Sequence, residues 1–167
     1  MVESGKSQGV QVPLEQKLVS YCSEFHLSIA LAESCTGGLI AERITSIPGA
    51  SVCFKGGVVS YANEVKQALL GVSPAILDIE GAVSETCAQA MADGARRACQ
   101  ADIGLSVTGI AGPGGATPSK PVGLVFIGVA TSKAISAKKF LFSGDRASIR
   151  QQAADAALQL ALENAIG

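Results

Sequence analysis

AESCTGG, residues 32–38, decides the fold of this chain, because a strand pattern passes into a helix pattern there. Residues 27–32 are mostly apolar, and the apolar residues after Gly38 recur with helical spacing. Ser34 therefore falls at the carboxyl end of a predicted strand. Ligands bind at that edge of open α/β sheets, and the first N–H groups of a helix have no partner within the helix. The stretch predicts a hydroxyl nucleophile on an anion-binding turn.

A structural interpretation of the same residues stays open. Ser34 and Thr36 are good helix caps, and Gly37 and Gly38 would allow tight packing without any chemistry. The stretch alone does not decide between the two interpretations.

Helix and strand patterns alternate outward from this turn. We expect strands over residues 27–32, 52–61, 103–108, 122–131 and 134–142, and helices over 14–25, 39–47, 63–71, 84–100 and from 145, with a short helix after Ser73-Pro74. Asn63 and Ser84 are the expected N-caps, and Gly56-Gly57 predicts an irregular strand. Strands separated by helices pair in parallel, whereas the last two, joined by Ser132-Lys133, must be antiparallel. The expected fold class is α/β, a three-layer α/β/α sandwich with a mixed, mostly parallel β-sheet.

Length and composition limit the function. A chain of 167 residues suffices for one domain, and we expect a mobile tail over residues 1–12 and a single domain over 13–167. No apolar run approaches the roughly 20 residues of a membrane span. The formal net charge is −1 and the basic residues are scattered, which disfavours nucleic-acid binding. We therefore expect a soluble protein without a membrane or nucleic-acid partner.

The cysteines and the single histidine restrict the chemistry. Five cysteines without a CxxC pair fit free thiols in a reducing cytoplasm, which is the expected location. His26, at a predicted helix end, is better explained as a C-terminal polar residue, and one histidine builds no multi-histidine metal site. Ser34 therefore needs a base of another kind.

Tyr61 and Lys66 are the candidate partners of Ser34. They belong to SYANEVK, residues 60–66, where a strand ends and a helix starts, so their side chains could reach the same sheet edge. Within one helix they would face about 140° apart, so they converge only if Tyr61 precedes the helix, which is where we place it. A lysine desolvated in such a cleft can lose its proton and act as a base. The ordinary alternative is a packed Tyr61 and a solvated Lys66.

TGIAGPGG, residues 108–115, is a glycine-rich loop that leaves a strand. Such turns can direct consecutive N–H groups at a phosphate or an oxyanion, although a plain flexible loop remains an alternative. The loop is not a dinucleotide fingerprint, because the GxGxxG spacing is absent and prolines prevent a helix from following. Arg146 adds a cation at a helix start, with a solvated arginine beside a capping Asp145 as the alternative.

Four blocks together resemble the CinA C-terminal domain family: AESCTGGLIAERIT at 32–45, PGAS at 48–51, GGVVSYANEVKQALLGV at 56–72 and TGIAGPGG at 108–115. The resemblance covers nearly the whole chain from about Leu14 onwards. It implies an amidohydrolase that acts on a linear amide, converting nicotinamide mononucleotide and water into nicotinate mononucleotide and ammonia in pyridine nucleotide recycling. Longer relatives carry an extra N-terminal domain, and its absence here favours a stand-alone deamidase.

The same resemblance implies a set of site residues. Ser34 would be the nucleophile, and Tyr61 and Lys66 would complete a Ser/Tyr/Lys centre that needs no metal and no cofactor. Backbone N–H groups of residues 34–38 or 109–112 could hold the oxyanion. The resemblance also implies a homodimer or a higher homo-oligomer. The expected substrate contacts are Glu33, Thr36, Gly37, Thr108, Gly109, Ala111, Gly112 and Arg146.

Two other functions stay open. The chain could be a non-catalytic nucleotide-binding or interaction module, because the family's name records competence and DNA damage rather than chemistry. Such a module would bind its ligand without turnover. Alternatively, Cys35 beside the helix start could be a thiol nucleophile, which alkylation would inactivate.

Overall fold

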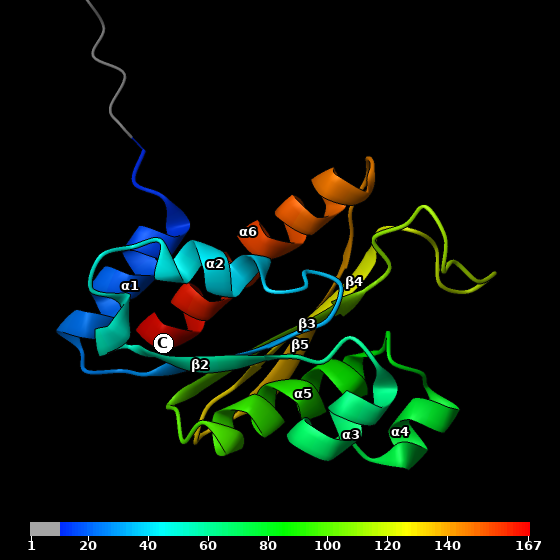
Figure 1. Cartoon of the computed structure of the whole chain (residues 1–167), viewed down its shortest axis with the longest axis horizontal. Coiled ribbons are helices and arrows are strands. Elements are labelled where there is room, and N and C mark those ends of the chain that lie inside the picture. Colours follow the sequence, from blue (N-terminus) through cyan, green and yellow to red (C-terminus); the bar gives the residue numbers. More distant parts are fainter. Residues whose placement is uncertain (1–10) are drawn as a thin grey trace, which may run out of the picture.

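The computed structural model describes residues 11–167 as five strands and six α-helices (Figure 1). The predicted tail over residues 1–12 lies outside this range apart from Gln11 and Val12. The strands are β1 (Ile29–Glu33), β2 (Phe54–Val59), β3 (Ile103–Gly109), β4 (Leu124–Ala130) and β5 (Ile135–Leu141). The helices are α1 (Leu14–Glu24), α2 (Leu39–Thr45), α3 (Asn63–Leu70), α4 (Pro74–Ile79), α5 (Glu85–Ala98) and α6 (Arg146–Ile166), with a short 3₁₀ helix, η1 (Ala50–Val52), before β2.

The strands form one mixed sheet in the order β2-β1-β3-β4-β5. β1 pairs in parallel with both β2 and β3, whereas β4 is antiparallel to β3 and to β5. Four of the five described strands therefore run in one direction, although only two of their four pairings are parallel. The predicted α/β fold with a mixed sheet is confirmed. The carboxyl ends of β1, β2 and β3 meet at one edge.

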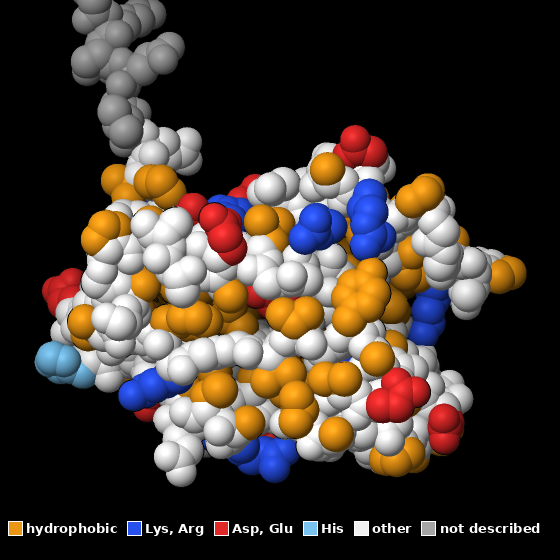
Figure 2. All heavy atoms as spheres, viewed as in Figure 1, with side chains coloured by type: hydrophobic (Ala, Val, Ile, Leu, Met, Phe, Trp, Pro, Cys, Tyr) orange, Lys and Arg blue, Asp and Glu red, His pale blue; other side chains and the backbone are white. Residues whose placement is uncertain are grey.

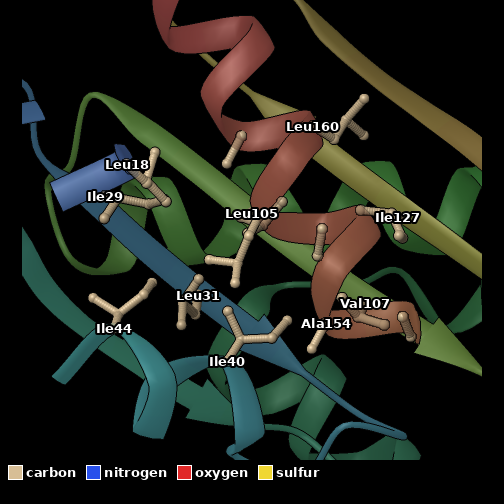
Figure 3. Close-up of a cluster of buried hydrophobic side chains, with 14 of the residues drawn as sticks. Leu18, Ile29, Leu31, Ile40, Ile44, Leu105, Val107, Ile127, Ala154 and Leu160 are labelled. Atoms are coloured by element: carbon tan, nitrogen blue, oxygen red, sulfur yellow. The ribbon is translucent and has the colours of Figure 1, made fainter. Parts of the chain in front are cut away.

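Helices cover both faces of the sheet, which gives the fold its three layers (Figure 1). α1, α2 and α6 pack over one face, where Ile29 and Leu31 of β1 join the larger hydrophobic core (Figure 3). α3, α4 and α5 pack over the other face, where Ala30 and Ala32 join a second core. This alternation follows from the pleat, because successive side chains of a strand point to opposite faces. Since all of β1 is buried, the chain emerges at Ser34 from the centre of the domain.

The helix starts confirm one predicted cap and correct another. Ser84 caps α5 as predicted, because its Oγ accepts a 3.2 Å hydrogen bond from the N–H of Cys87. Asn63 does not cap α3: the N-cap is Ala62, whose carbonyl accepts the N–H of Lys66, and Asn63 is already helical. The chain thus enters α3 one residue earlier than predicted.

The predicted irregularity of β2 is present beside Gly56-Gly57. Ile29 of β1 pairs with Phe54 and Ala30 pairs with Gly56, so the register shifts at Lys55. A bulge of this kind bends the strand locally and increases its twist.

Charged side chains form no single-sign patch on the face of the molecule that Figure 2 shows. On the face drawn in Figure 2, basic and acidic side chains are interspersed rather than gathered in a stripe. Across residues 11–167, none of the helices combines the length and the apolar character that a bilayer span requires. The beginning of α1 and the C-terminal end of α6 lie on one side of Figure 1, away from the carboxyl ends of β1 and β3.

Candidate active site

A cavity of about 270 Å³ opens at the edge where β1, β2 and β3 end. Its lining includes Ser34 after β1, Tyr61 after β2 and Thr108 near the end of β3. Asn63 and Lys66 of α3 and Arg146 of α6 add further polar side chains to the wall. The topology therefore brings together polar residues from four segments that are far apart in the sequence, at the edge where open α/β sheets bind ligands.

Ser34 lies on a tight turn that two glycines make possible. The N–H of Ser34 donates to the carbonyl of Val107 at 2.9 Å, which extends the pairing of β1 with β3 by one residue. Gly37 has a φ of +60° and Gly38 a φ of +103°, the left-handed region that residues with a Cβ rarely adopt. The turn places the Ser34 side chain in the cavity wall.

The predicted substrate contact of Glu33 is corrected by the structure. The Glu33 carboxylate accepts hydrogen bonds of 2.9–3.1 Å from the N–H groups of Gly38, Ile40 and Ala41. It therefore supplies the negative charge that the start of α2 attracts, and its side chain does not line the cavity. Three backbone donors satisfy this carboxylate, so Glu33 is a structural cap of α2.

Lys66 is buried beside Ser34. The lysine side chain is 1% exposed, and its Nζ lies 3.2 Å from Ser34 Oγ. The same Nζ donates to the carbonyl of Ser60 at 2.6 Å and contacts the carbonyl of Tyr61 at 3.4 Å. None of the ion pairs among residues 11–167 includes Lys66. The alternative of a solvated Lys66 is therefore wrong, and burial lowers the pKa of this amine below its usual 10.5.

Tyr61 precedes α3, as predicted, and stands at the mouth of the cavity with 62% of its surface exposed. Its hydroxyl accepts a 3.0 Å hydrogen bond from Arg146 Nη2. Lys66 contacts the backbone carbonyl of Tyr61 at 3.4 Å. The phenol is thus fixed by α6, while the backbone of the same residue helps to fix the lysine.

The glycine-rich loop forms another part of the cavity wall. The predicted substrate contacts Thr108, Gly109, Ala111 and Gly112 all line the cavity, and the Thr108 hydroxyl donates to the carbonyl of Ala82 at 2.7 Å. Arg146 Nη1 donates to the carbonyl of Gly112 at 2.8 Å. Arg146 therefore joins the loop to Tyr61 through two hydrogen bonds. Its side chain is nevertheless exposed and Asp145 caps α6, as the alternative interpretation expected.

Thr36 and Gly37 do not line the cavity, contrary to the prediction that both contact substrate. Thr36 is fully buried, and its Oγ1 has no hydrogen-bond partner among the described residues. The N–H of Gly37 donates to the carbonyl of Ser34 at 3.0 Å, so it closes the turn. The turn contributes Ser34 and Cys35 to the cavity lining, whereas the Thr36 side chain is buried outside it.

Sequence reasoning missed Arg150 and the loop before α5. Arg150 Nε and Nη2 donate to the carbonyls of Cys35 and Thr36. Its spacing of four residues from Arg146 on one helix was the available signal, because such residues share a helix face. Ala82 and Val83 line the cavity without carrying a chemical signal in the sequence.

The cavity is positively charged. Its lining contains Lys66 and Arg146 but, among the described residues, no Asp or Glu. Two cationic side chains without a carboxylate favour an anionic ligand. The residues from 11 to 167 hold no cluster of three His, Cys, Asp or Glu side chains arranged to bind a metal ion.

Cys35 is a poor nucleophile in this environment. Its side chain is 6% exposed, and burial raises the pKa of the thiol to about 11. The thiolate is the reactive form, so very little of it exists near neutral pH. The geometry therefore favours Ser34 over Cys35.

Comparison with known sequences identifies similar proteins over nearly the whole chain. The sequence model of the CinA C-terminal domain matches residues 11–165. A CinA-like protein of Acidobacterium capsulatum is 50% identical over 147 residues, which cover 88% of this chain and 36% of that protein. A CinA-like protein of Syntrophotalea carbinolica is 53% identical over 133 residues, covering 80% of this chain and 32% of the relative. The chain thus spans about a third of the length of these curated relatives.

Solved structures share the fold. The crystal structure of the competence/damage inducible protein CihA from Agrobacterium tumefaciens superposes with a TM-score of 0.89 at 36% identity, covering 92% of this chain and 94% of that one. A competence-damaged protein (CinA) superfamily structure from Enterobacter cloacae gives a TM-score of 0.89 at 27% identity and covers 99% of both chains.

Proposed function

Because the chain belongs to the CinA C-terminal domain family, we propose that it hydrolyses the carboxamide of nicotinamide mononucleotide to nicotinate mononucleotide and ammonia. The observation that carries the proposal is the buried Lys66 amine, 3.2 Å from Ser34 Oγ in the wall of an open cavity. Burying an unpaired lysine costs stability, so its place beside a hydroxyl calls for a functional explanation.

Lys66 acts directly on Ser34 in this proposal. A neutral amine has two N–H groups and one lone pair, and the carbonyls of Ser60 and Tyr61 match the two N–H groups. The lone pair is then left to accept the proton of the Ser34 hydroxyl. The hydroxyl of Tyr61 is held by Arg146, which supports a role in binding rather than in relaying the proton to Lys66.

The reaction proceeds through an acyl-enzyme. Ser34 Oγ bonds to the carboxamide carbon while its proton passes to Lys66, and the carbonyl electron pair moves onto the oxygen. When this tetrahedral intermediate collapses, the C–N bond breaks and Lys66 returns the proton to the departing nitrogen, which leaves as ammonia. Water then attacks the ester carbon while Lys66 takes one of its protons. The bond between the acyl carbon and Ser34 Oγ breaks, Lys66 passes the proton to Oγ, and nicotinate mononucleotide leaves.

The rest of the cavity suits an anionic nucleotide. Arg146 and the glycine-rich loop line the same cavity as Ser34, and the guanidinium and the loop N–H groups can receive a phosphate group. A volume of about 270 Å³ matches the small end of ligand pockets, as expected for a mononucleotide. We further propose that the protein works in the cytoplasm in pyridine nucleotide recycling, since its five free cysteines suit a reducing compartment. A homo-oligomer stays a prediction that light scattering can check.

The test is to incubate the protein with nicotinamide mononucleotide and to quantify both products, with Ser34→Ala as the control. Equimolar nicotinate mononucleotide and ammonia from the wild type alone would support the proposal. Absence of product from folded wild-type protein would refute it and would favour the nucleotide-binding module. Wild-type turnover by Ser34→Ala would remove Ser34 from the mechanism.

A further inference from the structure

Arg150 of α6 donates hydrogen bonds to the turn that carries Ser34, although more than a hundred residues separate the two in the sequence. Its Nε donates to the carbonyl of Cys35 at 3.2 Å, and its Nη2 donates to the carbonyl of Thr36 at 2.7 Å. The donors of one guanidinium lie in one rigid plane, so two successive peptide groups are held in a fixed relation to α6. The mechanism above makes no use of this contact.

The orientation of these carbonyls determines where the N–H groups of the turn point. In a planar trans peptide, the carbonyl and the following N–H point in opposite directions. Since the Cys35 carbonyl faces Arg150, the N–H of Thr36 is directed away from α6. The Thr36 carbonyl sets the N–H of Gly37 in the same way, and that N–H reaches the Ser34 carbonyl at 3.0 Å. The N–H groups of Thr36 and Gly37 therefore point to the inner side of the turn, opposite Arg150.

Two N–H groups of the turn lack an acceptor. Those of Ser34, Gly37 and Gly38 donate to oxygens within the protein, whereas those of Cys35 and Thr36 have no acceptor among residues 11–167. Cys35 is 6% exposed and Thr36 is fully buried. Buried N–H groups without a partner are rare and costly, so their presence points to an oxygen that a ligand supplies.

We infer that Arg150 is a positioning residue: by holding the Cys35 and Thr36 carbonyls it orients the N–H of Thr36, which joins that of Cys35 in binding the oxyanion formed at Ser34. This inference rests on the proposed hydrolysis, and it chooses the turn over the 109–112 loop as the oxyanion site. The N–H of the residue after the nucleophile is a common oxyanion donor in serine hydrolases. Two aligned N–H groups would stabilise the charge that develops in the transition state.

The charge of Arg150 adds to the effect of its hydrogen bonds. Arg150 and Arg146 both act to lower the pKa of the Cys35 thiol, against the larger effect of burial. The two guanidinium charges are therefore felt one residue from Ser34, where negative charge would develop. Arg146 lies at the positive end of the α6 dipole, an unfavourable place for a cation in the absence of a nearby anion.

The experiment compares Arg150→Gln and Arg150→Lys with the wild type and with Arg43→Gln. Arg43 is a matched control, because its guanidinium also joins distant segments, through Glu15 and Asp155, but donates no hydrogen bond to the turn that carries Ser34. We expect Arg150→Gln to lower kcat about 100-fold, the effect of a lost oxyanion donor, with KM changed by less than about threefold. Arg150→Lys should recover part of the loss through its charge. The pH midpoint of kcat/KM should not move, since the contacts of Lys66 are untouched.

A second readout separates this inference from the proposed substrate. Phenylmethylsulfonyl fluoride sulfonylates activated serines, with loss of fluoride from sulfur and of the hydroxyl proton to the base, and mass spectrometry measures the Ser34 adduct. Labelling should slow about 100-fold in Arg150→Gln and remain unchanged in Arg43→Gln. If the wild type is labelled but does not hydrolyse the nucleotide, the proposed function fails while the role of Arg150 is still tested. Equal labelling of wild type and Arg150→Gln, or no labelling of either, would overturn the inference. If Arg150→Gln does not fold, Arg150→Lys decides, with an expected loss of about tenfold.

Discussion

Replacing Lys66 with methionine should slow catalysis and stabilise the fold at the same time. Lys66 is 1% exposed, and no carboxylate of the described residues forms an ion pair with it. A buried charge without a counter-charge costs several kcal/mol even after relaxation. Methionine keeps a long unbranched chain of similar volume and carries no charge. The free energy of unfolding of the variant should therefore be higher by the amount that the wild type loses by burying the charged amine.

The net stabilisation is smaller than the relieved desolvation, because methionine cannot form the hydrogen bonds of the lysine. The carbonyls of Ser60 and Tyr61 lose a donor, at about 1 kcal/mol each. Setting this loss against the relieved desolvation leaves a net stabilisation of about 1–3 kcal/mol. For a domain of this length, each kcal/mol raises Tm by about 2–4 °C. Removal of the general base should lower kcat/KM by about 100-fold or more.

The stability difference should depend on pH with a definite sign. Burial lowers the pKa of folded Lys66 below 10.5, so between these two values the unfolded chain binds more protons than the folded one. The free energy of unfolding of the wild type therefore rises with pH through that window. Lys66→Met removes this contribution, so its advantage should be largest below the window and should shrink as the pH approaches 10.5.

Urea denaturation at about pH 7 and about pH 10 measures both effects, with Lys17→Met as the matched control. Lys17 is an exposed lysine of α1, and its replacement should change neither stability nor its pH dependence appreciably. The reasoning would be refuted if the wild type were more stable than Lys66→Met near neutral pH. An identical pH dependence of the two proteins would refute it as well.

Three further outcomes follow from the structure. The value of kcat/KM should rise with pH, with a midpoint below 10.5, because the proposed base is the neutral Lys66 amine and burial lowers its pKa. Glu33→Gln should lower the free energy of unfolding by about 2 kcal/mol in urea titrations, since its carboxylate accepts three backbone N–H groups. Gly94→Ala should cost about 2 kcal/mol or more, because a Cβ on this helix residue would overlap the Leu70 carbonyl of α3.

Each of these outcomes has a control or a contrary result. A kcat/KM that stays constant from neutral pH to about pH 10 would exclude Lys66 as a base that must lose a proton. Glu42→Gln removes an equal charge near the start of α2, although the Glu42 side chain caps no backbone N–H group there. A similar loss of stability in this variant would contradict the capping role of Glu33. Gly114→Ala adds a methyl group where no atom lies within 4 Å, and should leave stability unchanged.

Much of the fold was predictable from local patterns. The strands and helices follow hydrophobic periodicity, and their order implied which strands would be parallel. Asn63 shows the limit of such reasoning. A capping residue type raises the expectation of a helix start, but the start is set by where the chain leaves β2 and by the burial of Lys66.

The site was predictable where chemistry and spacing coincide. Ser34 follows β1 and Lys66 follows β2. The two residues meet because these neighbouring parallel strands end at one edge of the sheet, which the order of elements in the sequence implied. Glu33 was misassigned because a carboxylate next to Ser34 can either bind a ligand or accept the first N–H groups of the next helix. The direction of its side chain decides between these two roles, and the sequence does not give that direction. The contact of Arg150 with Thr36 spans 114 residues, and no local pattern encodes such a contact.

The position of the chain ends has a consequence for modular assembly. The first turn of α1 and the end of α6 lie away from the carboxyl ends of β1 and β3 (Figure 1), and the cavity opens at those strand ends. The described C-terminal residue, Gly167, shares a hollow with Leu27 and Asp102, which come just before β1 and β3. Additional polypeptide fused at either end would therefore leave the mouth of the cavity open. This geometry suits a domain that also occurs within longer proteins, such as the curated relatives of which the aligned part is about a third.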